Sequence, residues 1–135
     1  MLRASGWAAL LAACVALSGA ASAEDYPSRP IKVVVPYAAG GGTDALTRFV
    51  AHGLEQRLGQ PVIVENRSGA GTTMGGLAVA RSEPDGYTLI MGTSSTFAIA
   101  PGLYKKLAYD PVKDFTPIML IATVPFVMVV HPSLG

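Results

Sequence analysis

Short apolar runs alternate with loops of small residues along this chain, and this alternation limits the possible folds more than any other feature. Ile31–Val35 is a β-branched run that ends at Pro36, and 62–64 and 88–91 are shorter runs of the same kind. Continuous apolar runs of this length are typical of strands buried on both faces. Each run is followed by a loop containing glycine, serine or threonine. The pattern therefore predicts three buried strands with loops at their ends.

Helical segments are predicted between these strands. Thr43 or Asp44 can cap a helix, and Gly59 with Pro61 ends it in the usual order. Its expected apolar face consists of Leu46, Phe49, Val50, Leu54 and Leu58. Shorter helices are predicted over 75–82 and 97–103. Strands that alternate with helices imply right-handed crossovers, so the fold class is α/β with a mainly parallel sheet flanked by helices.

The last part of the chain is predicted to add two further strands. Residues 118–124 and 126–130 are apolar, and Pro125 separates them. Residues 104–116 are expected to be mostly irregular. No helix follows the last expected strand to cover it, which indicates either a chain that continues beyond residue 135 or a truncated product.

The first 23 residues have the pattern of a cleaved secretory signal peptide. Arg3 supplies a basic start, Gly6–Leu17 is apolar, and Ala21-Ser22-Ala23 is a small-x-small cleavage site. The apolar run is short for a transmembrane anchor, which needs about 20 residues. Leu11–Cys14 also fits a lipoprotein signal, so a lipid anchor at Cys14 is an alternative to a free periplasmic protein. The expected domains are thus a signal peptide over 1–23 and one α/β domain over 24–135.

Cleavage after Ala23 leaves 112 residues with nine Lys or Arg and nine Asp or Glu, and no cysteine. Zero net charge without a basic run argues against nucleic acid as a partner. Lack of cysteine suits an oxidising compartment but provides no disulfide.

Three loops could form a binding site, because loops that follow parallel strands meet at one edge of the sheet. They span 37–44, 66–73 and 92–96. The first contains Gly40, Gly41 and Gly42 and leads into a helix N-terminus, where free backbone amides favour an anion. Neutral hydroxyl donors follow on all three loops: Thr43, Thr72, Thr73, Ser94, Ser95 and Thr96. This set suits a small carboxylate, although the same residues also serve as ordinary turn and capping residues.

Other chemistries find little support in the sequence. The first loop lacks the Gly-Lys-Ser/Thr ending of a phosphate-binding loop, and Met74 interrupts the dinucleotide fingerprint begun by Gly69 and Gly71. Neither His52 nor His131 has a metal-ligand spacing, so no metal is expected. Asp44 can act as a helix cap or as a ligand contact, and Arg67 can meet an anion or pair with Glu65.

Five sequence blocks together resemble the solute-binding receptors of the tripartite tricarboxylate transporters, also called Bug-type receptors. The blocks are Tyr26–Ile31, Val35–Asp44, Gly59–Arg67 with Gly69–Gly71, Pro84–Leu89 and Tyr109–Phe115. The resemblance implies a periplasmic binding protein of type II, with two α/β lobes and a ligand cleft between them. It implies a small carboxylate ligand, delivery to membrane permease subunits, no enzymatic activity and no cofactor. A monomer is expected.

The resemblance also indicates which residues hold the ligand. Backbone amides of the first loop and a bridging water would grip a ligand carboxylate. The matching positions are Tyr37, Ala38, Ala39, Gly40, Gly41, Thr43 and Asp44, with Thr93, Ser94 and Ser95 on the third loop. Thr72–Gly75 departs from the family pattern, which leaves contacts from the second loop open.

Members of the resembled family are more than twice as long, so the second lobe is expected to be absent from this chain. A truncated fragment without function is therefore one alternative. A small α/β hydrolase or transferase that uses the same anion loop is another, although no nucleophile–base pair is evident in the sequence.

Overall fold

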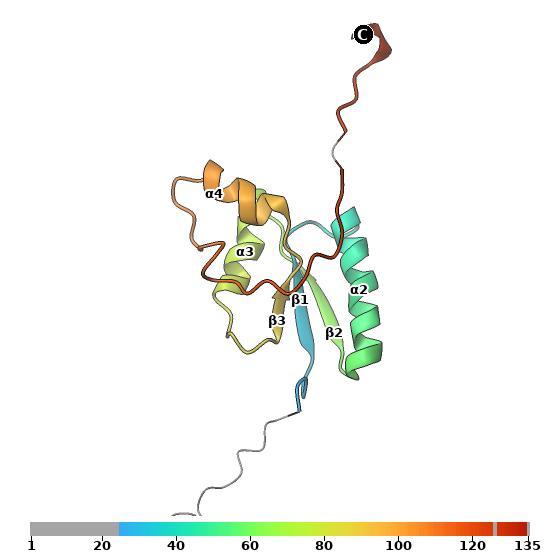
Figure 1. Cartoon of the computed structure of the whole chain (residues 1–135), viewed down its shortest axis with the longest axis vertical. Helices are drawn as coiled ribbons and strands as arrows, with labels where there is room; N and C mark the ends of the chain where they lie inside the picture. Colours follow the sequence, from blue (N-terminus) through green and yellow to red (C-terminus); the bar gives the residue numbers. More distant parts are fainter. Residues whose placement is uncertain (1–24, 126, 135) are drawn as a thin grey trace, which may run out of the picture.

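The computed structural model describes residues 25–125 and 127–134, and the expected signal peptide with Cys14 lies outside them. The chain forms a small α/β domain with short strands and helices in alternation (Figure 1). In chain order the elements are β1 (Ile31–Val35), α2 (Gly42–Leu58), β2 (Val62–Asn66), η1 (Ala70–Thr72), α3 (Thr73–Ala80), β3 (Thr88–Ile90), η2 (Ser95–Ile99), α4 (Ala100–Leu103) and η3 (Pro132–Leu134).

The three strands form one parallel sheet in the order β2-β1-β3. Ile31 pairs with Val62 on one side of β1, and Lys32 pairs with Thr88 on the other. The connection from β1 to β2 and the connection from β2 to β3 cross the sheet in opposite directions. Because both crossovers are right-handed, their helices lie on opposite faces of the sheet. Figure 1 shows this arrangement, with α2 on one side of the sheet and α3 with α4 on the other. The expected parallel α/β fold is confirmed.

The core is centred on β1, because that strand is covered on both faces. Ile31, Val34 and Val35 are at most 2% exposed. On the α2 side, Ile31 and Val33 pack with Ala51 and Val62. Burial on both faces explains why β1 is apolar at nearly every position rather than at alternate ones.

Helix α2 ends where the sequence predicts, but it turns a different face to the core. Gly59 follows the last turn with φ +66°, and its amide donates to the Glu55 carbonyl. The N-cap is Gly41 rather than Thr43 or Asp44. Of the five residues expected on the apolar face, Leu46, Val50 and Leu54 are half-buried, whereas Phe49 is 78% and Leu58 36% exposed. The buried positions are instead Asp44, Thr47 and Ala51.

Polar residues enter the buried face of α2 because each has a hydrogen-bonding partner. Thr47 donates from Oγ1 to the Thr43 carbonyl at 2.6 Å, and Asp44 accepts hydrogen bonds from neighbouring groups that belong to the candidate site. A buried polar group with a partner costs far less free energy than one without. The spacing of apolar residues alone could not reveal this, because the pattern counts apolar side chains only.

Helix α3 packs closely against its neighbours through two glycines. A Cβ added at Gly75 would lie 2.8 Å from Cβ and 2.9 Å from Cα of Pro36. A Cβ added at Gly76 would lie 2.8 Å from ring atoms of Tyr109. The helix begins at Thr73, two residues before the expected start, and ends at Ala80.

The two strands expected over 118–124 and 126–130 are not formed in the described residues, and this expectation was wrong. Residues 117–125 and 127–131 have no regular structure. Figure 1 shows the chain crossing in front of the strands and then leaving the domain as an extended C-terminal segment, in which Val127, Met128 and Val129 are 85–93% exposed. A strand needs an edge to pair with, and β-branched composition without a partner does not produce one. Within the described residues, no helix is both long and apolar enough to cross a membrane.

Candidate ligand-binding site

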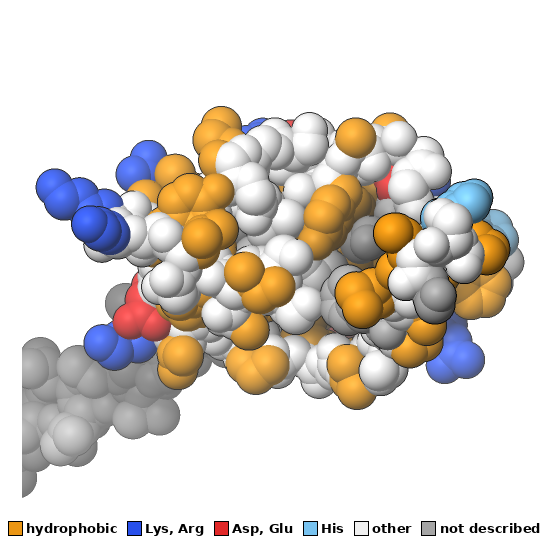
Figure 2. Space-filling view, turned by 90° about the horizontal axis from the view of Figure 1, so that it is seen from above, with side chains coloured by type: hydrophobic (Ala, Val, Ile, Leu, Met, Phe, Trp, Pro, Cys, Tyr) orange, Lys and Arg blue, Asp and Glu red, His pale blue; other side chains and the backbone are white. Residues whose placement is uncertain are grey.

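All three loops that follow the strands lie at one edge of the sheet, at the top of Figure 1. The loop after β1 spans 36–41, the loop after β2 spans 67–69, and the loop after β3 spans 91–94. Figure 2 views the molecule from this side. The middle of that face is mainly white and orange, and the side chains of Lys, Arg, Asp and Glu lie mostly at its rim. A ligand approaching this edge would therefore meet mainly neutral groups.

The first and third loops meet at the point where the chain leaves neighbouring strands in opposite directions. The chain leaves β1 toward α2 and leaves β3 toward η2 and α4 on the other side of the sheet (Figure 1). Tyr37 and Thr93 join the two loops through a hydrogen bond of 2.8 Å between their hydroxyl groups. Ligands in open α/β sheets bind in the crevice outside such a point. The structure thus brings together two of the expected site residues from different loops.

The first loop presents backbone amides at the N-terminus of α2. Residues 38–42 are all exposed. Gly41 is the N-cap and makes no side-chain cap bond, and its carbonyl accepts the first helical hydrogen bond, from the Ala45 amide at 3.0 Å. Within the described residues, the amides of Gly41, Gly42 and Thr43 have no hydrogen-bond acceptor. These free donors at the positive end of a 17-residue helix are suited to bind an anion.

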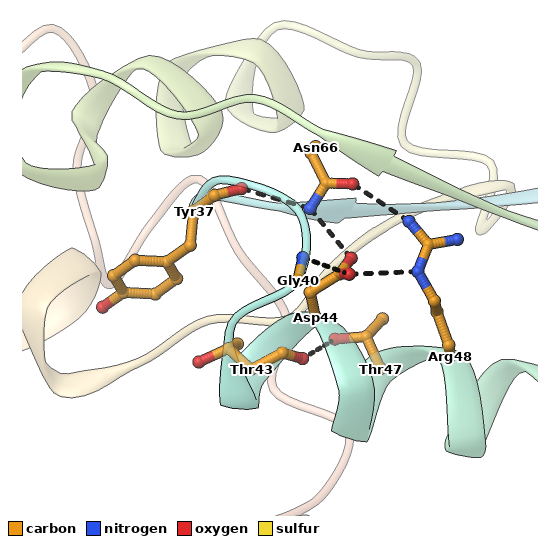
Figure 3. Close-up of polar contacts among 7 residues, drawn as sticks. All are labelled: Tyr37, Gly40, Thr43, Asp44, Thr47, Arg48 and Asn66. Carbon is orange, nitrogen blue, oxygen red and sulfur yellow. Dashed lines mark hydrogen bonds and ion pairs between the residues drawn. The ribbon is translucent and has the colours of Figure 1, made fainter.

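Asp44 lies beneath this loop and faces inward (Figure 3). The residue is 4% exposed. Its Oδ2 accepts hydrogen bonds from the Gly40 amide at 2.9 Å and from Arg48 Nε at 3.1 Å, and its Oδ1 accepts one from Asn66 Nδ2 at 2.9 Å. The donation from Arg48, followed by those from Gly40 and Asn66, lowers the pKa of Asp44 to about 2. Asp44 therefore remains charged with both oxygens engaged, and direct contact with a ligand stays a prediction.

A run of backbone with positive φ begins at the end of the second loop and continues through η1. Gly69, Ala70, Gly71 and Thr72 all have positive φ, at 134°, 44°, 61° and 80°. Positive φ is unusual for a β-branched residue such as Thr72. Its side chain is buried and accepts a hydrogen bond from Thr96 Oγ1 at 3.0 Å, while Thr73 donates to the Ala70 carbonyl. The hydroxyls of Thr72 and Thr96 are thus used within the protein rather than turned toward a ligand.

The remaining expected residues lie at the start of η2. The Thr93 carbonyl accepts hydrogen bonds from the amides of Thr96 and Phe97, and Ser94 is the N-cap of η2. Ser94 is exposed and Ser95 is half-buried. Their contact with a ligand is a prediction that the geometry at this edge permits.

Features that would support catalysis are weak in the described residues. Arg67 forms an ion pair with Glu65, in which Arg67 is exposed and Glu65 is half-buried. A Ser–His contact exists between Ser133 and His131, at 2.8 Å, but both residues are exposed on the same short turn, two positions apart. Across residues 25–125 and 127–134, no three His, Cys, Asp or Glu side chains are grouped closely enough to hold a metal ion.

Asn66 is the residue of this edge that the sequence reasoning did not single out. It ends β2, and its amide bonds the Tyr37 carbonyl at 3.1 Å as well as Asp44. Its Oδ1 accepts from Arg48 Nη2 at 3.1 Å. A polar residue at the end of an apolar strand is the signal that could have identified it.

Stability of the domain is expected to fall as the pH drops from about 5 to about 2. The pKa of Asp44 is about 2 in the folded chain against an ordinary value of 3.8. As the pH falls, the unfolded chain takes up the proton first. The contribution of Asp44 is therefore complete above its unfolded pKa and is lost as the pH falls through its folded pKa. The pKa values of Glu65, lowered chiefly by Arg67, and of Asp110, lowered chiefly by the Val112 amide, shift in the same direction.

Urea unfolding at several pH values between 7 and 2 measures this dependence. Asp44→Asn should be less stable than the wild type at pH 7 and should lose less stability on acidification. Glu83→Gln is a matched control, because the Glu83 carboxylate has no hydrogen bond or ion pair among the residues described here. If the free energy of unfolding fell with pH as steeply in Asp44→Asn as in the wild type, Asp44 would not contribute to the pH dependence.

Comparison with known proteins gives a consistent result. The family model described as "Tripartite tricarboxylate transporter family receptor" matches residues 46–134. Protein BugT of Bordetella pertussis is 41% identical over 123 residues, which cover 90% of this chain and 38% of BugT.

Solved structures show the same similarity. MatC from Rhodopseudomonas palustris with bound malate is 47% identical with a TM-score of 0.68, over 71% of this chain and 33% of MatC. R. palustris Rpa4515 with adipate is 39% identical with a TM-score of 0.60, over 69% of this chain and 31% of that protein. The chain thus spans between about three tenths and two fifths of the length of these relatives.

Proposed function

Because the chain belongs to the tripartite tricarboxylate transporter receptor family, we propose that it acts in a periplasmic solute-binding receptor for small carboxylates. The observation that carries the proposal is the set of amides at the α2 N-terminus that have no acceptor within the described residues, close to the hydrogen bond that joins the first and third loops. The resemblance to proteins solved with malate and adipate supports the same ligand class.

The proposed site consists of neutral donors that grip one carboxylate group of the ligand. The amides of the exposed first loop supply the donors, and the hydroxyls at the third loop supply a second set. The residues are Tyr37, Ala38, Ala39, Gly40, Gly41, Thr43 and Asp44 with Thr93, Ser94 and Ser95. Asp44 contributes through its hold on the loop or through a bridging water, because both of its oxygens already accept hydrogen bonds.

The remaining parts of the proposal concern location and partners. Residues 1–23 act as a cleaved export signal, and the receptor delivers its ligand to the permease subunits of the transporter. A free periplasmic protein is proposed in preference to a lipid anchor at Cys14. The function is binding and delivery, without turnover, and it requires no cofactor.

Thermal unfolding of the native product with a panel of acids tests this proposal. A ligand at 100 times its Kd should stabilise the protein by about 2.7 kcal/mol and raise its Tm. The panel includes malate, adipate, citrate, aromatic acids and amino acids. Adipamide serves as the matched neutral control for adipate, because it has the same carbon skeleton and lacks both negative charges.

An acid that raises Tm while its neutral analogue does not would support carboxylate recognition. Equal shifts from acid and amide would contradict it, and so would a full panel without any shift. The mass of the native product gives a separate readout of the cleavage site, since cleavage after Ala23 predicts an N-terminus at Glu24.

A further inference from the structure

The three glycines at the end of the first loop and the start of α2 have almost no packing partners. A Cβ added at Gly40 or Gly42 would have no heavy atom within 4 Å, and one at Gly41 would meet only the Ala38 carbonyl oxygen, at 3.8 Å. Gly40 also has φ +86°, in the region that glycine adopts freely. Three successive glycines have a large conformational freedom to lose. The shape of the loop must therefore come from polar contacts with more rigid elements.

We propose that Asn66 is a positioning residue of the ligand site: it fixes the first loop by binding the Tyr37 carbonyl and the Asp44 carboxylate at once. This inference rests on the proposed function. The two acceptors lie on either side of the loop, at its start and after its end (Figure 3). Asn66 stands at the end of β2, which pairs with β1 along its whole length. It therefore ties a glycine-rich loop to the sheet.

The orientation of the Asn66 amide follows from its neighbours. Nδ2 faces two acceptors, Tyr37 O and Asp44 Oδ1, and Oδ1 faces the Arg48 guanidinium. Rotating the amide by half a turn would set an oxygen against two oxygens. Arg48 donates hydrogen bonds to both Asn66 and Asp44, so each of the three side chains restricts the orientation of the other two. Only an amide offers two donors and one acceptor in this arrangement.

The position of Asp44 explains why the loop needs this hold. Asp44 is the third residue of α2, and acidic side chains in the first turn readily accept hydrogen bonds from the free amides of a helix N-terminus. Those amides are the donors proposed for the ligand. Asn66, Arg48 and Gly40 occupy both oxygens of Asp44 and keep the carboxylate turned inward. Without Asn66, Asp44 Oδ1 becomes free to compete with the ligand.

The test compares Asn66→Ala and Asn66→Asp with a control, Gln56→Glu, in the native product. Gln56 lies on the exposed side of α2 and bonds only His52 among the described residues, so the control adds the same charge away from the loop. Affinity for malate and adipate is measured between pH 8 and pH 5.5, relative to wild type at the same pH. Asn66→Ala should bind about tenfold more weakly, the equivalent of one lost hydrogen bond to a charged group.

Asn66→Asp gives a readout that a purely structural role would not produce. A carboxyl beside Asp44 has a raised pKa, because two adjacent carboxylates repel each other. At pH 8 the variant should bind as weakly as Asn66→Ala. Toward pH 5.5 it gains a proton and can donate again, so its relative affinity should recover, whereas that of Asn66→Ala stays low. The other nearby charges are Arg48 and Glu65 with its partners Lys32 and Arg67, and they are the same in every variant.

A measurement without ligand separates this inference from the proposed function. Hydrogen exchange of the Gly40 amide, which bonds Asp44, reports the position of the loop directly. Both Asn66 variants should lower its protection factor at pH 8 by about tenfold, and acidification should restore it in Asn66→Asp alone. Unchanged Gly40 protection would overturn the positioning role whether or not any acid binds. Lost protection together with an acid panel that gives no binding would contradict the proposed function and leave the positioning role standing.

Discussion

Replacing Tyr109 with alanine is expected to lower the free energy of unfolding by about 3–5 kcal/mol, as for other large buried aromatic residues. Tyr109 is 6% exposed. Its ring packs edge-on against Phe115, with centroids 5.6 Å apart, and covers Gly76 of α3. Its hydroxyl donates to the Thr96 carbonyl at 2.7 Å. One side chain thus fastens the irregular segment after α4 to both α3 and η2.

Tyr109→Phe separates the two contributions of this side chain. The ring remains, but the Thr96 carbonyl loses its side-chain partner in a buried site, which costs about 1–3 kcal/mol. Burial also raises the pKa of the Tyr109 hydroxyl, as expected for a neutral donor inside the domain. Tyr104→Phe is the matched control, since its hydroxyl donates to the Ala70 carbonyl from an exposed position. Its cost should stay within about 0.5–1 kcal/mol.

Urea unfolding followed by circular dichroism measures all three variants. A loss below about 1 kcal/mol for Tyr109→Ala would show that the segment from residue 104 to residue 116 does not pack on α3. Equal losses for the two phenylalanine variants would show that the Tyr109–Thr96 hydrogen bond is not buried.

Gly75→Ala is expected to destabilise the domain by about 1–3 kcal/mol, although alanine is the better helix former. The added Cβ would lie 2.8–2.9 Å from Pro36 Cβ and Cα and 3.1 Å from the Arg67 carbonyl oxygen. Two of these atoms belong to the backbone, so the clash cannot be relieved by a rotamer change. Helix α3 would have to move away from the end of β1, which also leads into the first loop.

Gly53→Ala, also inside a helix, is expected to change the stability in the opposite direction. Gly53 lies inside α2, and a Cβ there would have no heavy atom within 4 Å outside the helix itself. The substitution should stabilise the domain by about 0.5–1 kcal/mol, because glycine in a helix interior loses more backbone entropy than alanine. Two glycines exchanged for the same residue would then shift the urea midpoint in opposite directions. A shift in the same direction for both would contradict the close packing of α3.

The sheet could be predicted from sequence because its central strand carries unambiguous signals. Burial on both faces requires Ile31–Val35 to be almost wholly apolar, and Pro36 cannot continue the ladder, so the strand has the predicted bounds. The end of α2 was equally clear, because Gly59 takes the left-handed conformation that a helix end commonly needs.

The inward face of α2 and the apolar segment after residue 117 could not be predicted in the same way. Asp44 and Thr47 are buried because of hydrogen bonds to residues far along the chain or one turn away, and periodicity of apolar residues contains no information about such bonds. The segment over 118–130 has strand composition, but pairing depends on an available edge. The role of Asn66 likewise becomes visible only when the Tyr37 carbonyl and Asp44 are placed on either side of it.

The central place of β1 has a consequence for the order in which the domain folds. β1 precedes both of its partners, so pairing Ile31 with Val62 closes a loop of about 31 residues and pairing Lys32 with Thr88 closes one of about 56. The longer closure costs only about 0.5 kcal/mol more chain entropy, because the cost grows with the logarithm of loop length. Loop length therefore hardly determines whether β1 pairs first with β2 or with β3. The 17-residue helix between β1 and β2 can dock as soon as it forms, and this favours the β1–α2–β2 unit as the nucleus onto which β3 is added.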